Sequence, residues 1–597
     1  MKIRVADYIV ARLREAGVDT VFLLNGGGMM HLVDAVGRCE GMRYVCSHHE
    51  QASAMAADGY ARLSGRVGVC CATSGPGATN ILTGLVGAWQ DSAPLLFLTG
   101  QSKTSQTIAQ SGIEHLRQYG TFEVDIVPIV ASVTKYAHML TDPASVRYHL
   151  EKALHLAASG RPGPVLLDLP LDMQGALVEP DELLGYTPEE PAAAAAPTAA
   201  QLDEVLALLA GAKRPLLLAG VGVRAGHASA ALRRLAETLD VPLITTQLGK
   251  DALHYDHPLF VGHSGPKGDR AGNFAVQTAD LIISLGCSLH SQTTGWENKL
   301  FAPDAVKVQV ELDGAVLARE QVGVRLKIQA GVAEFIAALQ PLALPHGGAA
   351  WRASCQSWKQ RYAVRNEAHQ RADDGLNFYH FVEELSHQLP ERACVVSDAG
   401  SAFYVTGQAL RLRDGQRFIS SGSLGAMGYA LPAACGAAFV AAEQMVVCVT
   451  GDGSLMTNVH DLATMRQYQP NLKLFVVNND GYVSMRNTQR EFFGGLLIGA
   501  DSSSGVFIPA MRALAETYQL PFLRCEREDQ LAATVAQALA MPGPVLCEIV
   551  GMRNQRIIPA VASKRLPDGR MVSTPLHDMV PNLADAVLAQ EILNATT

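Results

Sequence analysis

MVVCVTGDGSLMTNVHDLATMRQYQPNLKLFVVNNDG occupies residues 445–481 and decides the fold. One apolar run ends there in GDGS (451–454), and a second apolar run ends in NNDG (478–481). The segment between them is compatible with a helix. Unbroken apolar runs joined by helical segments are typical of parallel strands that are covered on both faces. The polar ends of the two strands are therefore expected at one edge of a sheet, where α/β folds bind ligands.

These polar ends carry groups that suit a metal ion and a phosphate. Glycines let the backbone turn sharply and approach an anion closely, and a helix start offers free N–H groups to phosphate oxygens. The Asp452 carboxylate and the Asn479 amide oxygen are hard donors of the kind that Mg²⁺ prefers. A GDG tripeptide alone is most often a turn. Its combination with an Asn-rich strand end at this spacing predicts a site for a metal ion and a phosphate-bearing ligand.

The same alternation of apolar runs and helical patterns extends over the whole chain. Strands are predicted at 67–73, 94–100, 163–170, 214–220, 281–286, 306–312, 394–398, 445–452, 472–479 and 544–550. Linker composition rich in proline, alanine and glycine occurs at 186–200 and 341–350. We therefore predict an α/β protein with three doubly wound parallel-sheet domains, at residues 1–185, 200–342 and 360–597.

Composition and charge exclude several classes of protein. The chain has 597 residues, of which 48% are hydrophobic and 18% charged, which excludes a largely disordered protein. Its formal net charge is −9 without a basic block, so we expect no nucleic-acid partner. No apolar run reaches the ~18 residues of a membrane span, and the first residues lack the apolar core of a signal peptide. Eleven cysteines without a CxxC pattern predict buried free thiols and a cytoplasmic protein.

The motif at 451–481 is that of thiamine diphosphate binding, and the whole chain resembles the acetohydroxyacid (acetolactate) synthase-like group of thiamine diphosphate enzymes. That group has a pyrimidine-binding, a central and a diphosphate-binding domain. The resemblance implies that Asp452, Asn479 and the carbonyl of Gly481 bind Mg²⁺. It also implies diphosphate contacts from two strand-end turns, at Gly400, Ser401, Gly451, Gly453 and Ser454.

The segment SLGAMG (423–428) resembles the part of these enzymes that holds the aminopyrimidine ring. By composition alone, Met427 would be core filler. The resemblance implies instead that Met427 lies between the two cofactor rings and that the Gly425 carbonyl accepts a hydrogen bond from the 4′-amino group.

Glu50 is the predicted acid. A glutamate at a helix start is often only a favourable dipole contact. Within the pattern HEQASAMAADGYA (49–61), however, it matches the glutamate that shares a proton with N1′ of the pyrimidine, which prepares the 4′-nitrogen to act as the base. The turn at 73–80 matches as well and implies cofactor contacts from Gly75 and Asn80. In this group the acid and the metal site come from different subunits, so a homodimer or homotetramer is implied.

The substrate side matches less closely. Strand-end and loop positions suggest seven candidate contacts, for each of which a structural role is the alternative: Asn25, Gly26, His31, Gln101, Gln110, Ser484 and Thr488. We interpret the three glycines at 26–28 as backbone placed against a ligand. The group's amino-acid-pathway members carry a tryptophan near the position of Thr488. Its absence, together with the loop at 24–31 and the tail at 564–570, resembles carboligases that attach a two-carbon unit to keto sugars. Alternatively, the side chains after the metal motif point to solvent or brace the C-terminal segment.

Three hypotheses for function follow. The first is a carboligase that decarboxylates pyruvate or a similar 2-keto acid and joins the acyl unit to an acceptor carbonyl. The second is a 2-keto acid decarboxylase, C–C lyase or C–C hydrolase with the same cofactor. The third, an inactive paralogue, is disfavoured by the intact Glu50 and metal motif. FAD in the central domain stays open, because Gly220, Gly222 and Gly249 resemble a flavin-binding pattern but no arginine lies near Ser288.

Overall fold

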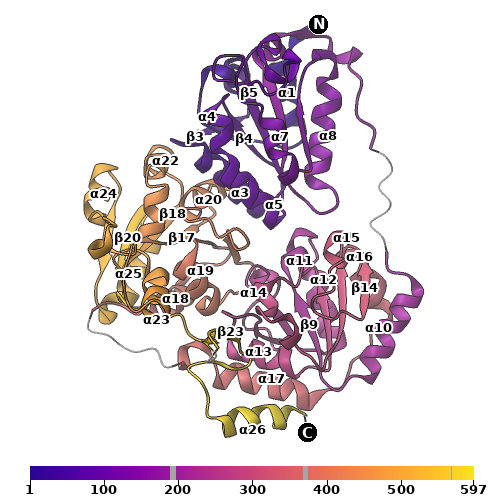
Figure 1. Ribbon diagram of the computed structural model, residues 1–597, viewed down its shortest axis with the longest axis vertical. Coiled ribbons are helices and arrows are strands. Elements are labelled where there is room, and N and C mark those ends of the chain that lie inside the picture. Colours follow the sequence, from indigo (N-terminus) through magenta and orange to yellow (C-terminus); the bar gives the residue numbers. More distant parts are fainter. Residues whose placement is uncertain (189–195, 368–373, 566–567, 597) are drawn as a thin grey trace.

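The computed structural model describes residues 1–188, 196–367, 374–565 and 568–596. It contains three α/β domains, each built on a six-stranded parallel sheet, as predicted. Figure 1 shows the N-terminal domain at the top, the central domain below it and the C-terminal domain at the side. Residues 189–195 of the expected first linker and residues 566–567 of the expected substrate tail lie outside the described residues.

The N-terminal sheet has the strand order β3-β2-β4-β5-β7-β6, and every pairing is parallel. Its strands are β2 (Thr20–Leu23), β3 (Arg43–Cys46), β4 (Gly68–Ala72), β5 (Leu95–Gln101), β6 (Tyr136–Met139) and β7 (Val165–Pro170). Its main helices are α1 (Val5–Glu15), α2 (Met30–Arg38), α3 (Glu50–Ser64), α4 (Pro76–Asn80), α5 (Leu82–Asp91) and α8 (Val146–Ala158). The apolar runs predicted here are fully buried strands.

The central sheet has the order β11-β10-β9-β12-β13-β14, again parallel throughout. Its strands are β9 (Pro215–Ala219), β10 (Leu243–Thr245), β11 (Phe260–His263), β12 (Leu281–Leu285), β13 (Val306–Glu311) and β14 (Leu326–Gln329). The helices include α10 (Ala199–Gly211), α11 (Val221–Ala225), α12 (Ser229–Leu239), α13 (Arg270–Thr278), α16 (Val332–Leu339) and α17 (Ala349–Arg361).

The C-terminal sheet repeats the arrangement with the order β16-β15-β17-β18-β20-β19. Its strands are β15 (Cys394–Ser397), β16 (Arg417–Ser420), β17 (Val446–Gly451), β18 (Leu472–Asn478), β19 (Phe522–Cys525) and β20 (Val545–Val550). The helices include α18 (Phe378–Gln388), α19 (Gly400–Ala409), α20 (Ala430–Ala437), α21 (Asp452–Thr457), α22 (Asp461–Tyr468), α23 (Val483–Phe492), α24 (Met511–Thr517) and α25 (Glu528–Ala540).

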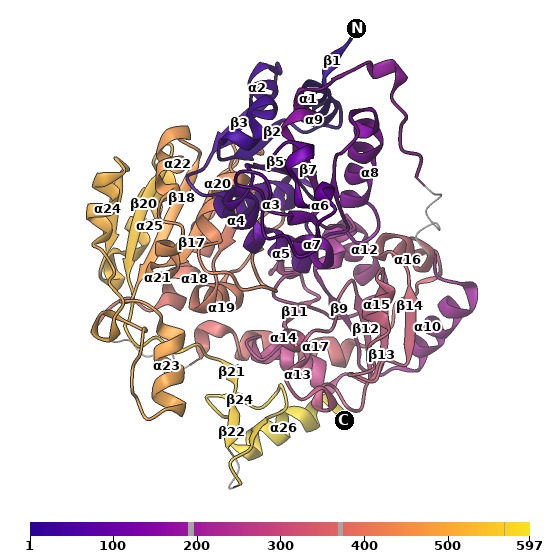
Figure 2. The same cartoon turned by 45° about the horizontal axis from the view of Figure 1, so that its top comes forward.

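The last residues leave the C-terminal sheet and return to the central domain. Two short antiparallel pairs form there, β21 (Ala560–Val561) with β24 (Met579–Val580) and β22 (Ser563–Arg565) with β23 (Met571–Ser573). Helix α26 (Asp585–Thr596) follows, and it lies beside α17 and α13 (Figure 2). The indole of Trp358 donates to the Glu591 carboxylate at 2.9 Å. The expected third domain, 360–597, thus includes a tail that packs on the second.

The N-terminal and C-terminal domains meet through α3 and α20, which are closely packed along their length. Small residues make this possible, because a Cβ on Gly59 would overlap the carbonyl of Ala433, and one on Gly436 would overlap the carbonyl of Ala56. Both clashes would be with backbone, which cannot swing away as a side chain can. This contact fixes the position of Glu50, at the start of α3, relative to the C-terminal sheet.

Among the described helices, none is both long and apolar enough to cross a membrane.

We predict that Gly436→Ala lowers the thermal unfolding midpoint. Overpacking of this kind costs about 1–3 kcal/mol, and it outweighs the roughly 1 kcal/mol that Gly→Ala contributes inside a helix. The matched control is Gly87→Ala in α5, where the new Cβ would meet Leu424 at an ordinary 3.8 Å. Thermal denaturation of both variants checks this. Equal midpoints for Gly436→Ala and wild type would show that the two helices separate easily.

Candidate active site

The metal motif forms where β17 and β18 end side by side. The two strands pair in parallel, with Gly451 opposite Val477. The Asp452 side chain is fully buried and collects three backbone donors: Gly453 N donates to Oδ1 at 2.8 Å, and Gly481 N and Asn479 N donate to Oδ2 at 2.8 and 3.2 Å. Burial raises the pKa of Asp452 to about 6, against the lowering effect of these donors. The carboxylate therefore links the two strand ends.

The side-chain amide oxygen of Asn479 gives the clearest indication of a ligand at these strand ends. Asn479 is buried, and its Oδ1 has no hydrogen-bond partner in the described structure. A buried polar atom without a partner is costly and calls for an explanation. A cation bound between Asn479 and Asp452 provides one, and oxygen donors of this kind suit Mg²⁺. The space is available, since a Cβ on Gly451 would meet no atom within 4 Å.

The expected diphosphate residues gather around the same strand ends. Helix α19 begins at Gly400 and Ser401, after β15, and Gly400 has a positive φ of 63°. Helix α21 supplies Gly453 and Ser454 in its first turn. Ser484 was expected to be a substrate contact. Its Oγ is buried and has no hydrogen-bond partner within the described part of the chain. It lies 3.8 Å from the position of a Cβ on Gly400, so it faces the expected diphosphate residues.

Asp398 begins the strand-end turn 398–401, which was expected to contact the diphosphate, and its side chain has a structural role that was not predicted. It is buried at the end of β15, where Gly428 N donates to its Oδ1 at 2.9 Å and Thr450 Oγ1 to its Oδ2 at 2.9 Å. Burial raises its pKa. It therefore fixes the end of the aminopyrimidine segment 423–428 to the neighbouring strand β17. The sequence pattern that could have indicated this role is an aspartate directly after an apolar strand run, at 394–398.

Within that segment, Gly425 and Met427 face outward. A Cβ on Gly425 would meet nothing within 4 Å, and Gly425 has a φ of 70°. Met427 is 43% exposed, which is unusual for an apolar side chain that belongs to a tight glycine-rich loop. The single chain thus presents both residues on an open surface.

The N-terminal domain carries Glu50, the predicted acid. Glu50 is the first residue of α3 and is buried, with Asn80 Nδ2 donating to its Oε2 at 3.0 Å. Gly75 precedes α4 with a φ of 65°, and a Cβ there would meet the Phe122 carbonyl at 2.6 Å. Asn80, the last residue of α4, thus orients the Glu50 carboxylate. Within the described residues, no hydrogen bond joins Glu50 to the loop at 452–481.

Three predicted substrate residues are engaged inside the N-terminal fold. Gln101 is buried and donates from Nε2 to Val124 O at 2.8 Å and to Asp168 Oδ2 at 3.0 Å, so it braces the 102–124 loop. The glycines of the 24–31 loop were interpreted as ligand-facing. A Cβ on Gly26 would meet Thr73 at 2.5 Å, so close packing also explains this glycine, and its contact with a ligand stays a prediction. The His31 ring lies 3.1 Å from a Cβ position on Gly175.

The remaining three are exposed. Asn25 lies in a loop after β2, and Gln110 lies in the short helix α6 (Ile108–Ser111) of the N-terminal domain. Thr488 lies on the exposed face of α23, and its hydroxyl donates to Ser484 O at 3.0 Å. Among the described residues, none of these three side chains is hydrogen-bonded to Glu50, whose carboxylate accepts from Asn80.

Arg486, one of the side chains that follow the metal motif, is directed into the fold. Its side chain is fully buried, and its guanidinium donates to the carbonyls of Asn479 at 2.6 Å, Asp480 at 2.5 Å and Arg553 at 2.6 Å. Burial lowers its pKa. Asn487 Nδ2 donates to Gln555 O at 2.9 Å. Both side chains therefore brace the metal loop and the C-terminal segment, which is the alternative left open above.

The central-domain glycines pack against one another. Cβ atoms on Gly220 and Gly222 would both strike Gly286, and one on Gly249 would meet the Ala219 carbonyl at 2.8 Å. Close approach of the turns after β9 and β12 thus accounts for the glycine pattern without a flavin.

Comparison with known proteins agrees with this geometry. Three family models match in order along the chain: the N-terminal TPP binding domain of thiamine pyrophosphate enzymes over residues 3–123, the central domain over 202–339 and the C-terminal TPP binding domain over 398–549. The acetolactate synthase large subunit of Parasynechococcus marenigrum is 34% identical over 97% of this chain and 92% of its own length. Acetolactate synthase isozyme 2 large subunit of Escherichia coli is 32% identical over 91% and 95%, respectively. The chloroplastic acetolactate synthase 2 of Nicotiana tabacum is 31% identical over 94% and 83%.

We predict that Arg486→Met weakens Mg²⁺ binding by about 10–100-fold, as is typical when a group that holds a metal ligand is removed. Arg486→Lys should recover part of the loss, because one ammonium can replace some of the donors. The control is Arg490→Met on the same helix, whose guanidinium bonds Asn554 at the surface. Calorimetric titration of Mg²⁺ in the presence of thiamine diphosphate measures the effect. A folded Arg486→Met protein with wild-type affinity would contradict it.

Proposed function

The chain belongs to the family of thiamine pyrophosphate enzymes, and on that premise we propose that it is a carboligase that releases CO₂ from pyruvate or a similar 2-keto acid and joins the acyl unit to an acceptor carbonyl. The observation that carries this proposal is the partnerless Oδ1 of buried Asn479 beside Asp452, which fits a bound Mg²⁺. The relatives named acetolactate synthase, which match nearly the whole chain, support carboligation over simple decarboxylation.

Each part of the C-terminal site has a task in this proposal. Asp452, Asn479 and the Gly481 carbonyl hold Mg²⁺, while the first turns of α19 and α21 and the Ser484 hydroxyl receive the diphosphate. N–H groups at helix starts and a divalent ion together neutralise its charge. Met427 and Gly425 contact the rings. Thiamine diphosphate supplies a carbanion that adds to carbonyl groups.

Glu50 controls the proton on the pyrimidine N1′. Its burial removes competing water, and the Asn80 amide fixes one carboxylate oxygen, leaving the other free to bind the ring nitrogen. Positioned acid–base groups of this kind typically contribute about 10²–10⁴-fold to a rate.

We also propose a homodimer or homotetramer in which Glu50 of one subunit completes the site of another. Exposed apolar side chains support this, both on the N-terminal domain, which carries Glu50, and on the C-terminal domain, which carries the metal motif. On the N-terminal domain they are Met30, Tyr44, Ile113, Tyr119 and Phe122, and on the C-terminal domain Met427, Met485, Phe492, Phe493, Leu496, Ile498 and Phe507. Contiguous exposed apolar surface marks interaction sites, and closed two-fold symmetry is the commonest arrangement of oligomers.

The acceptor in this proposal is a keto sugar. Residues 482–497 contain no tryptophan, and Thr488 presents a small hydroxyl-bearing side chain where the resemblance places an indole. With Arg486 and Asn487 engaged in the fold, the support for a polar acceptor rests on Thr488 and the room that the absent indole leaves.

Flavin binding would have no part in this chemistry, because no hydride is transferred. The packing of Gly220, Gly222 and Gly286 supports a central domain that needs no flavin. Visible absorbance of the purified protein decides between the two alternatives.

We predict that mixing inactive Glu50→Ala with inactive Asp452→Ala subunits restores activity. Each mixed dimer would contain one site with both groups intact and one with neither. Activity regained after subunit exchange, with each variant alone as control, checks this. Demonstrated exchange without any recovery would mean that acid and metal site act within one chain.

We predict that kcat/KM with pyruvate as donor is higher for polyhydroxylated ketones or keto-sugar nucleotides than for 2-ketobutyrate. A site built to hydrogen-bond hydroxyl groups can reject analogues without them by about 10⁴–10⁵-fold. Mass spectrometry of the products identifies the acceptor. A preference for 2-ketobutyrate or a second pyruvate would return the chain to acetolactate formation, and acetaldehyde as sole product would make it a decarboxylase.

A further inference from the structure

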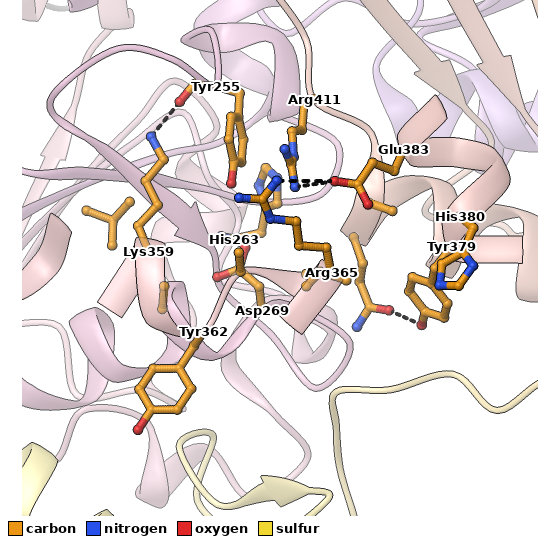
Figure 3. A pocket seen from close by; sticks show the side chains of 16 residues that line it. Tyr255, His263, Asp269, Lys359, Tyr362, Arg365, Tyr379, His380, Glu383 and Arg411 are labelled. Atoms are coloured by element: carbon orange, nitrogen blue, oxygen red, sulfur yellow. Dashed lines mark hydrogen bonds and ion pairs between the residues drawn. The ribbon is translucent and has the colours of Figure 1, made fainter. Parts of the chain in front are cut away.

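A polar pocket lies between the central and C-terminal domains, away from the residues of the active site described above (Figure 3). Its walls come from three parts of the chain. Tyr255, His263 and Asp269 belong to the central domain around β11, Lys359 and Arg365 to α17 and the turn after it, and Glu383 and Arg411 to the C-terminal domain. Anything bound there would touch both domains and their connection.

Cations outnumber anions around this pocket. Arg411 Nη2 lies 2.9 Å from Glu383 Oε1, and Arg365 Nη1 lies 3.8 Å from the same oxygen. Among the described residues, neither guanidinium has another side-chain ion pair or hydrogen bond. A guanidinium carries five N–H donors, so two of these groups share one carboxylate oxygen and most of their donors remain available. Figure 3 shows both side chains directed toward the Glu383 carboxylate.

Lys359 adds a third cation. Its Nζ donates to the Tyr255 carbonyl at 2.5 Å and lies 4.6 Å from the centre of the Tyr255 ring. The Arg411 guanidinium lies 5.2 Å from the centre of the same ring. Cation–π contacts of this kind hold charges in place without neutralising them. Partial burial lowers the pKa of Lys359 to about 8, so it is mostly protonated at neutral pH.

The acidic side chains do not balance this charge. Burial raises the pKa of Asp269 to about 6, and its two oxygens already accept from the backbone N–H groups of Gly272 at 2.7 Å and His263 at 2.8 Å. His380 is directed to Glu528, outside the pocket, with 2.9 Å between Nδ1 and Oε1. Burial holds the pKa of His263 well below its usual value, so its ring is neutral. One net positive charge therefore remains inside the pocket.

We propose that this pocket binds a small phosphate-bearing anion, held by Arg365, Arg411 and Lys359 across the domain boundary. Guanidinium groups match phosphate oxygens in pairs, and the ammonium adds a point charge. A phosphate has enough oxygens to receive all three cations at once, whereas a carboxylate has two. Bound phosphate would also relieve the repulsion between cations that now gather around one aromatic ring.

Calorimetry with inorganic phosphate tests the proposal. The enzyme is first saturated with thiamine diphosphate and Mg²⁺, so that the diphosphate site cannot receive the probe, and chloride keeps the ionic strength constant. We expect saturable binding in the wild type. Arg365→Met should weaken it by about 10–100-fold, the equivalent of roughly 1.5–3 kcal/mol for hydrogen bonds to a charged group. Arg365 is more than half exposed, so its loss should leave the fold intact.

Two further variants distinguish a binding role from a structural one. Glu383→Gln removes the competing carboxylate and should tighten phosphate binding, which no loss of stability would produce. Arg233→Met, a surface change in the central domain, is the control and should leave affinity unchanged. Absence of saturable binding, equal affinity in Arg365→Met and wild type, or binding of acetate as tight as that of phosphate would overturn the proposal.

Discussion

The Asp452 carboxylate is the interaction on which the candidate site depends. It accepts backbone N–H groups from its own turn and from the end of the adjacent strand, so two strand ends separated in sequence by α21 and α22 form one surface. A buried carboxylate keeps its charge only when donors or a cation compensate its lost hydration. Arg486 adds to the arrangement by donating to the backbone carbonyls of Asn479 and Asp480 in the same loop. Among the described residues the Asn479 side-chain oxygen has no hydrogen-bond partner, so this small network also holds an oxygen donor beside the Asp452 carboxylate.

The sequence predicted the three-domain architecture with parallel sheets, because the longest strands are continuous apolar runs separated by helical segments. Shorter strands such as β10, β14 and β19 were not predicted, because three or four residues give too little pattern to recognise. The polar residues that follow the predicted strands meet at one edge of each sheet, as parallel pairing requires. Asn80 and Glu50 show the same logic, since two strand-end turns bring them within 3.0 Å. These relations depend on chain order and need no knowledge of side-chain direction.

What the sequence could not provide was the direction of polar side chains between those ends. Gln101 and Arg486 are polar residues of the kind that line pockets. In the structure both side chains are directed into the fold, where they donate hydrogen bonds to backbone carbonyls. Their partners lie up to 67 positions away, at residues such as Arg553, and no local pattern records such pairs. The glycines of the 24–31 loop and of the central domain were ambiguous for the same reason. A glycine is required both where backbone packs closely on a neighbouring segment and where backbone approaches a ligand closely. The sequence does not distinguish these two cases.

The C-terminal tail adds a mechanical consequence. The N-terminal domain is joined to the central domain by one covalent connection, but the central and C-terminal domains are joined twice, through the segment after α17 and again through the chain leading into β21. Buried hydrogen bonds add to these two crossings, since Lys250 Nζ donates to Gly407 O at 2.9 Å and Gln408 Nε2 donates to Gly268 O at 3.0 Å. The central and C-terminal domains are therefore tied to each other more firmly than either is tied by the chain to the N-terminal domain.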